Sequence, residues 1–235
     1  MTTVTAMTTG TQSTRSVFLV GAAGGVGRRL TTLLHGQGHR VTGMHRAGTQ
    51  ASVIRDAGGT PVAGDLVADP VPTLAERLAG HDAVVFSAGA HGTGADQTTA
   101  IDGRGLEKAA GAAAAASVRR FVLVSVFMDA LRHQPRSEGF EHYMRVKRAA
   151  DVHLAATDLD WLIVRPGDLL DDRGTGRVTA GVSIPYGSVP RDDVAAFIAA
   201  CLFEPDLNRT DVELTGGDVA IPDAIARLTP RPWRG

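Results

Sequence analysis

Two residues four positions apart, Tyr143 and Lys147, are the first candidates for chemistry in this sequence. They lie in the segment HYMRVKRAAD, within a helix predicted over residues 139–156. On a helix this spacing puts both side chains on one face, about one turn apart. An ammonium group stabilises a nearby phenolate, so we expect Lys147 to lower the pKa of Tyr143 from about 10. Tyr143 would then exchange a proton beside a carbonyl, and Lys147 could also bind a ribose. The alternative is a chance pair on a helix surface.

A glycine-rich turn predicts a binding site for the phosphates of a dinucleotide. Gly21, Gly24 and Gly27 follow a β-branched apolar run over residues 16–20 and precede apolar residues at helical spacing. Glycines permit a tight turn and close backbone approach, and the start of a helix supplies free N–H groups. The spacing is not the G-x-G-x-x-G fingerprint, so the order of strand, glycines and helix carries the prediction. The other expected cofactor contacts in this turn are Ala23, Gly25 and Val26.

The end of the next predicted strand, residues 39–45, indicates which dinucleotide binds. A cofactor with a free 2′-hydroxyl usually meets an acidic residue about 20 residues after the glycines. This chain has Arg46 there, and a guanidinium suits a 2′-phosphate by charge and bidentate hydrogen bonding. We therefore expect NADP(H) to be preferred over NAD(H), unless Arg46 is only a solvated surface charge. Arg28 and Arg29, in the first helix, could add to the phosphate field.

Further candidates lie at the carboxyl ends of later predicted strands. Asp65 could accept a hydrogen bond from the adenine amino group while Leu66 packs on the ring, or Asp65 could cap the turn before the next helix. Small residues at 87–89 would let the chain pass close to the nicotinamide ribose. The candidates after the fourth, fifth and sixth strands are Ser87, Ala88, Gly89, Ser125 and Pro166.

Strand-like and helix-like segments alternate along the chain, which predicts an α/β fold with a Rossmann-like, doubly wound parallel sheet and helices on both faces. Ligands of such sheets bind beyond the carboxyl ends of the strands, where the Gly- and Pro-containing segment 168–190, with one or two short strands, is expected to cover the substrate. The predicted strands cover residues 16–20, 39–45, 60–63, 83–86, 119–125 and 159–164. The predicted helices cover residues 25–36, 49–57, 72–79, 96–116, 139–156, 191–203 and 221–228.

Length and composition indicate the domain organisation, the location and the kinds of partner to expect. The 235 residues predict one domain over residues 16–235, after a flexible Thr-rich tail at residues 1–15 that lacks the regions of a secretory signal. A net charge of −1 gives no reason to expect nucleic acid or an anionic membrane, and no segment reaches the roughly 18 apolar residues of a membrane span. Cys201, the single cysteine, excludes an intrachain disulfide and suits a reducing cytoplasm. We expect a cytoplasmic monomer or small homo-oligomer with a small-molecule substrate and no metal.

An ordered set of segments gives the sequence a family resemblance. It runs through GAAGGVG, GDL, FSAG, IDGRGLEKAA, VRRFVLVS, YMRVK, WLIVRPG and VPRDDVAAFI. The chain resembles the short-chain dehydrogenases/reductases, and within them the atypical branch that includes NmrA-like regulators and biliverdin reductase B-like flavin reductases. The resemblance implies a Rossmann-like fold, NADP bound through the positions above, and Tyr143 with Lys147 as the family's Y-x-x-x-K pair. Asp102 matches an acidic position of this branch.

One departure leaves the function open. The family commonly has two serines at the end of the fifth strand, and this chain has Ser125 followed by Val126. If Ser125 serves, the catalytic triad is complete and the protein is an NADPH-dependent oxidoreductase that passes hydride to a small carbonyl, quinone or flavin-type acceptor. If the second serine is required, a non-catalytic NADP(H)-binding redox sensor is the alternative. A sugar-nucleotide epimerase or dehydratase is disfavoured, because only about 70 residues follow the RPG segment.

Overall fold

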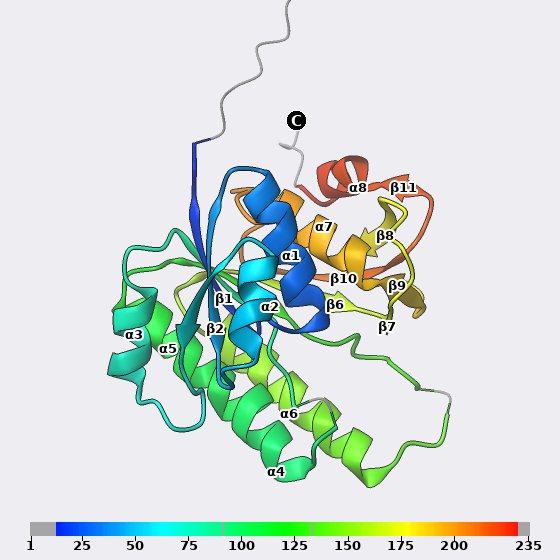
Figure 1. Cartoon of the computed structure of the whole chain (residues 1–235). Helices are drawn as coiled ribbons and strands as arrows, with labels where there is room; N and C mark the ends of the chain where they lie inside the picture. Colours follow the sequence, from blue (N-terminus) through cyan, green and yellow to red (C-terminus); the bar gives the residue numbers. More distant parts are fainter. Residues whose placement is uncertain (1–12, 91, 133, 230–235) are drawn as a thin grey trace, which may run out of the picture.

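The computed structural model describes residues 13–229, apart from residues 91 and 133. Within them a nine-stranded sheet has the order β11-β8-β10-β6-β5-β4-β1-β2-β3 (Figure 1), and β7 and β9 form a separate pair. The strands are β1 (Ser16–Val20), β2 (Arg40–His45), β3 (Thr60–Ala63), β4 (Ala83–Phe86), β5 (Arg120–Val124), β6 (Asp160–Pro166), β7 (Asp168–Leu170), β8 (Arg177–Gly181), β9 (Ser188–Pro190), β10 (Thr210–Gly216) and β11 (Val219–Ala220).

The helices cover both faces of this sheet (Figure 1). They are α1 (Gly25–Gly36), α2 (Gln50–Asp56), α3 (Val71–Leu78), α4 (Ala95–Thr98), a π-helix η1 (Thr99–Gly105), α5 (Leu106–Ala115), α6 (Glu138–Ala155), α7 (Arg191–Cys201) and α8 (Ile221–Leu228). Within this sheet, neighbouring strands from β3 to β10 are parallel, and β8 pairs antiparallel with both β10 and β11. The order 3-2-1-4-5-6 is that of a doubly wound sheet, so the predicted Rossmann-like class is confirmed.

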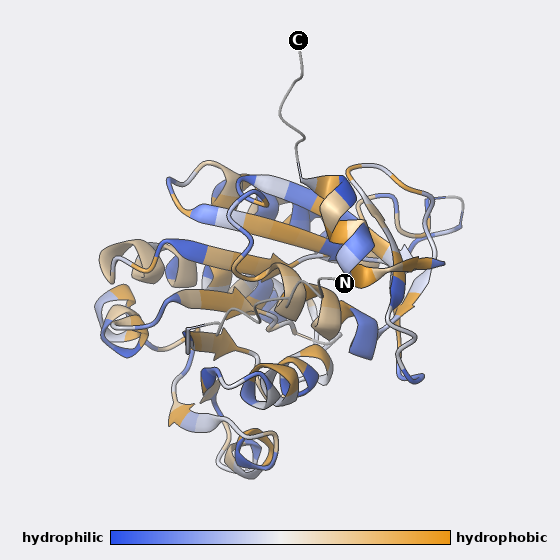
Figure 2. Ribbon diagram, turned by 90° about the horizontal axis from the view of Figure 1, so that it is seen from above, coloured by the Kyte–Doolittle hydropathy of each residue, from blue (hydrophilic) through white to orange (hydrophobic). Residues whose placement is uncertain are grey.

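Both faces of the central strands are buried, which explains their nearly continuous apolar sequences. In β1 every residue is buried; Val17 and Leu19 join the cluster formed with α1, α7 and α8, whereas Phe18 and Val20 join the cluster formed with α3 and α5. Figure 2 shows these strands as a hydrophobic layer between helices of mixed character. Because complete burial of such a side chain contributes about 1.5–3 kcal/mol, these two clusters hold the helices on the sheet.

The structure extends the sheet beyond the predicted strands. β10 was not predicted, although Val212 and Leu214 alternate with polar residues; in the structure residues 212–215 are all buried. The segment 168–190 contains three short strands instead of the one or two expected. The helix predicted over residues 96–116 is divided into α4, the π-helix η1 and α5. Residues 1–12 of the predicted tail lie outside the described residues, and Arg15 is already anchored by an ion pair of 3.3 Å with Asp82.

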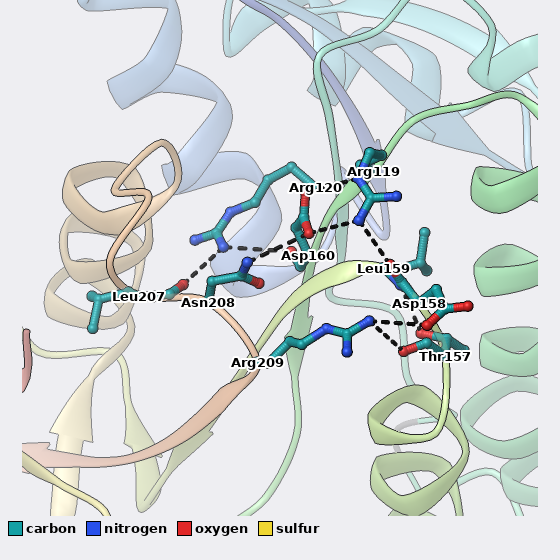
Figure 3. A network of polar contacts seen from close by, with 9 residues as sticks. All are labelled: Arg119, Arg120, Thr157, Asp158, Leu159, Asp160, Leu207, Asn208 and Arg209. Atoms are coloured by element: carbon teal, nitrogen blue, oxygen red, sulfur yellow. Dashed lines mark hydrogen bonds and ion pairs between the residues drawn. The ribbon is translucent and has the colours of Figure 1, made fainter. Parts of the chain in front are cut away.

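A polar network fixes the amino ends of β5 and β6 and the start of β10 (Figure 3). Arg119 pairs with Asp160 at 3.0 Å, and Arg209 pairs with Asp158 at 3.2 Å. Arg120 donates to the carbonyl oxygens of Leu202 and Cys201 and so binds the end of α7. Since ligands of parallel sheets bind at the opposite, carboxyl edge, this network stabilises the fold and lies away from the site.

Three further findings concern Cys201, membrane-spanning helices and clusters of metal-binding side chains. Cys201 is buried, and burial raises the pKa of its thiol to about 12, so it is a packed core residue. Among the described residues no helix is both long enough and apolar enough to cross a membrane. The same part of the chain contains no cluster of three or more side chains suited to hold a metal ion.

Candidate functional site

Three adjoining cavities lie at the carboxyl ends of the parallel strands. The first has a volume of about 540 Å³ and the second about 310 Å³, and they share walls formed by Gly24 and residues 87–89. The third, of about 470 Å³, opens from the first beside Tyr143 and Arg191. Together they form one cleft that extends from the end of β2 to the segment around β7.

The glycine turn between β1 and α1 forms the floor of this cleft. Gly21 has φ of +87°, and a Cβ there would lie 2.6 Å from the backbone nitrogen of Ala88, so the ends of β1 and β4 meet only because this residue is glycine. Gly24 is the N-cap of α1 and provides no side-chain cap, which leaves the first N–H groups of the helix without partners. The turn therefore offers backbone donors and the positive end of a helix dipole to an anion.

The second cavity contains the residues expected at the adenosine end. Arg46 lies on its wall, largely exposed; its backbone N–H donates to Gln50 Oε1 at 3.1 Å, and its guanidinium has no hydrogen-bond partner within the described chain. Nδ1 of His45, also on this wall, is buried without a partner. Asp65 accepts a hydrogen bond of 2.8 Å from the N–H of Val67, so it does cap its turn while facing this cavity.

The two arginines early in α1 differ from each other. Arg29 donates to the carbonyl oxygen of Gly25 and pairs with Asp192 and Asp171. Arg28 is exposed. Arg29 is therefore occupied in fixing α1 to the start of α7, and Arg28 faces solvent.

Tyr143 and Lys147 lie on α6 and line the first cavity. Ser125, directly after β5, lines the same cavity. Lys147 is almost completely buried; its Nζ donates to the carbonyl oxygen of Val124 at 3.2 Å and lies 3.7 Å from Oδ1 of Asp102. Burial lowers the pKa of Lys147, and the Asp102 carboxylate opposes that change.

Asp102 connects the lysine to the loop after β4. Its Oδ2 accepts a hydrogen bond of 2.9 Å from the N–H of Ala90, while its Oδ1 faces Lys147. Asp102 lies in the π-helix η1, a rare geometry that occurs often at functional sites. The sequence marked this acidic position but gave it no role, because the contact depends on how η1 packs against α6.

The pKa of Tyr143 differs from the expectation. Burial raises it well above its ordinary value, and the carboxylates of Asp102 and Asp151 add to the increase. The prediction that Lys147 lowers this pKa is therefore wrong, because Asp102 offsets the ammonium charge and the phenol is removed from water. Tyr143 is a neutral phenol at physiological pH, suited to donate a proton.

Sequence reasoning missed Asp151, which binds Ser125. The Ser125 hydroxyl donates a hydrogen bond of 2.5 Å to Oδ1 of Asp151, and Oδ2 accepts one of 2.9 Å from Arg165. Asp151 follows Lys147 by four residues on α6, so the same helical spacing that paired Tyr143 with Lys147 could have found it. Burial raises the pKa of Asp151, and its two hydrogen-bond partners oppose that shift. In this geometry Ser125 presents a lone pair to the cavity, and not a proton.

Comparison with known proteins identifies the family. A family model described as NAD(P)H-binding matches residues 21–205. The chain belongs to this NAD(P)H-binding family. It is 36% identical to a Bacillus subtilis protein named as an uncharacterized sugar epimerase, YhfK, over 90% of this chain and 99% of the relative. The resemblance to atypical short-chain dehydrogenases/reductases drawn from the sequence is thereby confirmed.

Two solved structures of this kind superpose over most of the chain. One is a Bacillus halodurans protein assigned provisionally as an NAD-dependent epimerase/dehydratase, with a TM-score of 0.83 and 33% identity over 91% of this chain and 100% of that one. The other is ChuY, an anaerobilin reductase from Escherichia coli O157:H7, with a TM-score of 0.72 and 26% identity over 87% of this chain and 98% of that one. Names in this NAD(P)H-binding family thus include both epimerases and a reductase.

Nearly all of the residues predicted to contact an NAD(P)H cofactor line the cleft. Gly27 does not line it. A Cβ there would overlap the carbonyl oxygen of Gly21, so Gly27 is needed for α1 to pack closely on the turn. Pro166 lines only the third cavity, away from the glycine turn. The others line the first cavity, the second or both: Gly21, Ala23, Gly24, Gly25, Val26, Arg46, Asp65, Leu66, Ser87, Ala88, Gly89 and Lys147.

The structure also brings Arg191 into the site, to which the sequence assigned no role. Arg191 begins α7 and lines both the first and the third cavities. The third cavity combines apolar and aromatic side chains with the polar side chains of Ser125, Tyr143 and Asp168. Its side walls include Ala130, Leu131, Phe140, Leu169 and Tyr186.

Proposed function

We propose that this protein is an NADPH-dependent reductase that transfers hydride to a small conjugated acceptor, such as a carbonyl compound, a quinone or a flavin. One observation carries the proposal: Tyr143 and Lys147 line the same cavity as Gly24 and Gly25 of the phosphate turn. A cofactor held by its phosphates at that turn would extend toward this pair, as the length of a dinucleotide requires.

The cofactor, when bound, supplies the hydride, and the residues of the chain hold it and manage the proton. The open N–H groups at the start of α1 would bind the diphosphate, and Arg46 the 2′-phosphate. Asp65 and Leu66 would contact the adenine. The small residues at 87–89 would allow the nicotinamide ribose to approach the backbone, where Lys147 can bind its hydroxyl groups.

Tyr143 is the proton donor in this proposal. Hydride addition to a carbonyl creates negative charge on its oxygen, and a neutral phenol is a suitable donor to that oxygen. Lys147 lines the same cavity, but Asp102 offsets its charge, so its role is to bind the ribose and not to lower the pKa of Tyr143. Ser125 takes a different role from the one expected, since its proton is engaged by Asp151 and it can only accept a hydrogen bond.

The third cavity supports a conjugated acceptor over a sugar. Leu131, Phe140, Leu169 and Tyr186 provide an apolar, partly aromatic surface next to Tyr143, which favours a flat ring system.

The test follows NADPH oxidation by absorbance against a panel of quinones, flavins, aldehydes and ketones, with sugar nucleotides as a parallel panel. We expect turnover with members of the first panel only. Conversion of a sugar nucleotide without net NADPH oxidation would instead support an epimerase.

A non-catalytic NADP(H) sensor is the second candidate, and one observation favours it. The Ser125 hydroxyl donates its hydrogen bond to Asp151, and Val126 stands where the family commonly has a second serine, so the acceptor has one hydroxyl donor fewer than in a complete triad. Tight NADPH binding without turnover on any acceptor would support this candidate.

A further inference from the structure

We propose that Arg191 binds the diphosphate of the dinucleotide, and that it exchanges the carboxylate of Asp171 for that phosphate. The side chain of Arg191 lies across the start of α1. A Cβ added to Gly25 would lie 2.7 Å from Cδ of Arg191 and 2.9 Å from its Nε. Since a Rossmann-like fold holds its diphosphate at this helix end, Arg191 lies beside the position that the phosphates take.

The start of α1 lacks a full positive charge of its own. Its first turn contains no acidic residue, and the glycine turn offers only N–H groups and a helix dipole. Arg191 lines the first cavity together with Gly24, Gly25 and Val26. Its guanidinium can supply the missing charge and a bidentate pair of hydrogen bonds to phosphate oxygens.

The present partners of Arg191 are ones that a phosphate can replace. Its Nη1 donates to the carbonyl oxygen of Leu169 at 2.9 Å and lies 3.2 Å from Oδ2 of Asp171. The Asp171 side chain is 73% exposed, and exposed ion pairs are weak. Arg29 also contacts Asp171, at 3.4 Å through Nη2, while its Nε pairs with Asp192. Asp171 therefore retains Arg29 as an ion-pair partner when Arg191 turns to the phosphate.

The first experiment measures dissociation constants by fluorescence titration for Arg191→Ala, Arg191→Lys and the unmodified protein. NADPH carries the diphosphate, whereas adenosine 2′-phosphate has no phosphate on the 5′ side. We expect Arg191→Ala to weaken NADPH binding by about ten- to a hundredfold, the usual effect of a charge-assisted contact, and to leave adenosine 2′-phosphate unchanged. Arg191→Lys should retain part of the NADPH affinity.

A matched control removes an arginine charge at a position outside the cleft, between β7 and β8. Arg173 is exposed, carries no hydrogen bond within the described chain and lines none of the three cavities, so Arg173→Ala should leave both affinities unchanged. Melting curves show whether each variant is folded.

Asp171→Asn provides a test of opposite sign, and it acts at an exposed side chain whose loss does not threaten folding. Because it removes the competing carboxylate, we expect it to tighten NADPH binding by about two- to fivefold, the range of an exposed ion pair. The gain should disappear when Arg191→Ala is added to it.

Three results would overturn the proposal. They are an unchanged NADPH affinity in Arg191→Ala, an equal loss for NADPH and adenosine 2′-phosphate, and no tightening in Asp171→Asn. A rise only in the KM of the acceptor would assign Arg191 to the substrate instead. All of these readouts except KM are binding constants, so they remain decisive even if the protein proves to be a sensor without turnover.

Discussion

The hydroxyl of Ser125 donates a hydrogen bond of 2.5 Å to Oδ1 of Asp151, and both residues are buried. Asp151 is in turn held by Arg165, which also pairs with Asp211 at 2.6 Å. Ser125 is therefore the inner end of a polar chain that joins β5, α6, β6 and β10. Ser125 was a candidate member of the catalytic triad, and in the structure its hydroxyl instead stabilises the packing of these four elements.

Ser125→Ala should consequently destabilise the protein more than it weakens NADPH binding. The change leaves the buried carboxylate of Asp151 without one of its donors, and hydrogen bonds to charged groups contribute about 1.5–3 kcal/mol. Urea denaturation gives the free energy of unfolding. Ser188→Ala is the control, because Ser188 is exposed and its side chain makes no hydrogen bond within the described residues. A loss of stability no larger than in the control would contradict this assignment.

The structure separates two glycines of the phosphate turn. Gly24→Val adds a side chain to the floor of the cleft, where its Cβ would lie 3.1 Å from the carbonyl oxygen of Gly21, and should abolish NADPH binding while circular dichroism stays native. Gly27→Val should also unfold or strongly destabilise the protein, because its Cβ overlaps the turn itself. Gly36→Ala is the control, since nothing lies within 4 Å of its Cβ. Unchanged NADPH affinity in a folded Gly24→Val protein would exclude this turn as the phosphate site.

Arg46 should determine the choice of cofactor. Arg46→Asp replaces a charge-assisted contact to the 2′-phosphate with repulsion, so NADPH affinity should fall by about ten- to a hundredfold while NADH affinity changes little. Fluorescence titration with both cofactors measures the ratio. Arg40→Asp makes the same charge change at the exposed amino end of β2 and should leave the ratio intact. Equal affinity of the unmodified protein for NADPH and NADH would remove the basis for this role.

Tyr143→Phe should lower turnover by about a hundredfold or more while NADPH affinity changes little, because only the proton donor is lost. Tyr186→Phe removes the hydroxyl of another tyrosine that lines the third cavity. It is the control and should not cause this loss of turnover. Lys147→Ala should reduce both turnover and binding. If Tyr143→Phe keeps its turnover, the acceptor is reduced without this acid, and the oxidoreductase would remain without its proposed triad.

The pH dependence gives a separate check on Tyr143. A general acid works in its protonated form, and burial raises the pKa of Tyr143 above the ordinary value of about 10. Activity that depends on this proton should therefore persist as the pH rises and should be lost only above pH 10. A basic limb near pH 7 that disappears in Tyr143→Phe would show instead that the pKa is lowered.

The sequence by itself determined the features that depend on neighbours along the chain. The strand, glycines and helix from Ser16 onward follow from local periodicity and turn chemistry, and the alternation of segments predicts the Rossmann-like sheet. The spacing of Tyr143 and Lys147 requires only that α6 is a helix. These features can be predicted because each depends on residues close together in sequence or on the order of segments along the chain.

Only the tertiary structure decided how the charges of the site are distributed. Asp102 reaches Lys147 because η1 packs on α6, and Arg191 reaches Gly25 because α7 packs on α1. The raised pKa of Tyr143 follows from burial and from two carboxylates brought near by that packing. Electrostatic effects depend on distance in space and on exposure to water, and neither quantity is written in the spacing of residues along a chain.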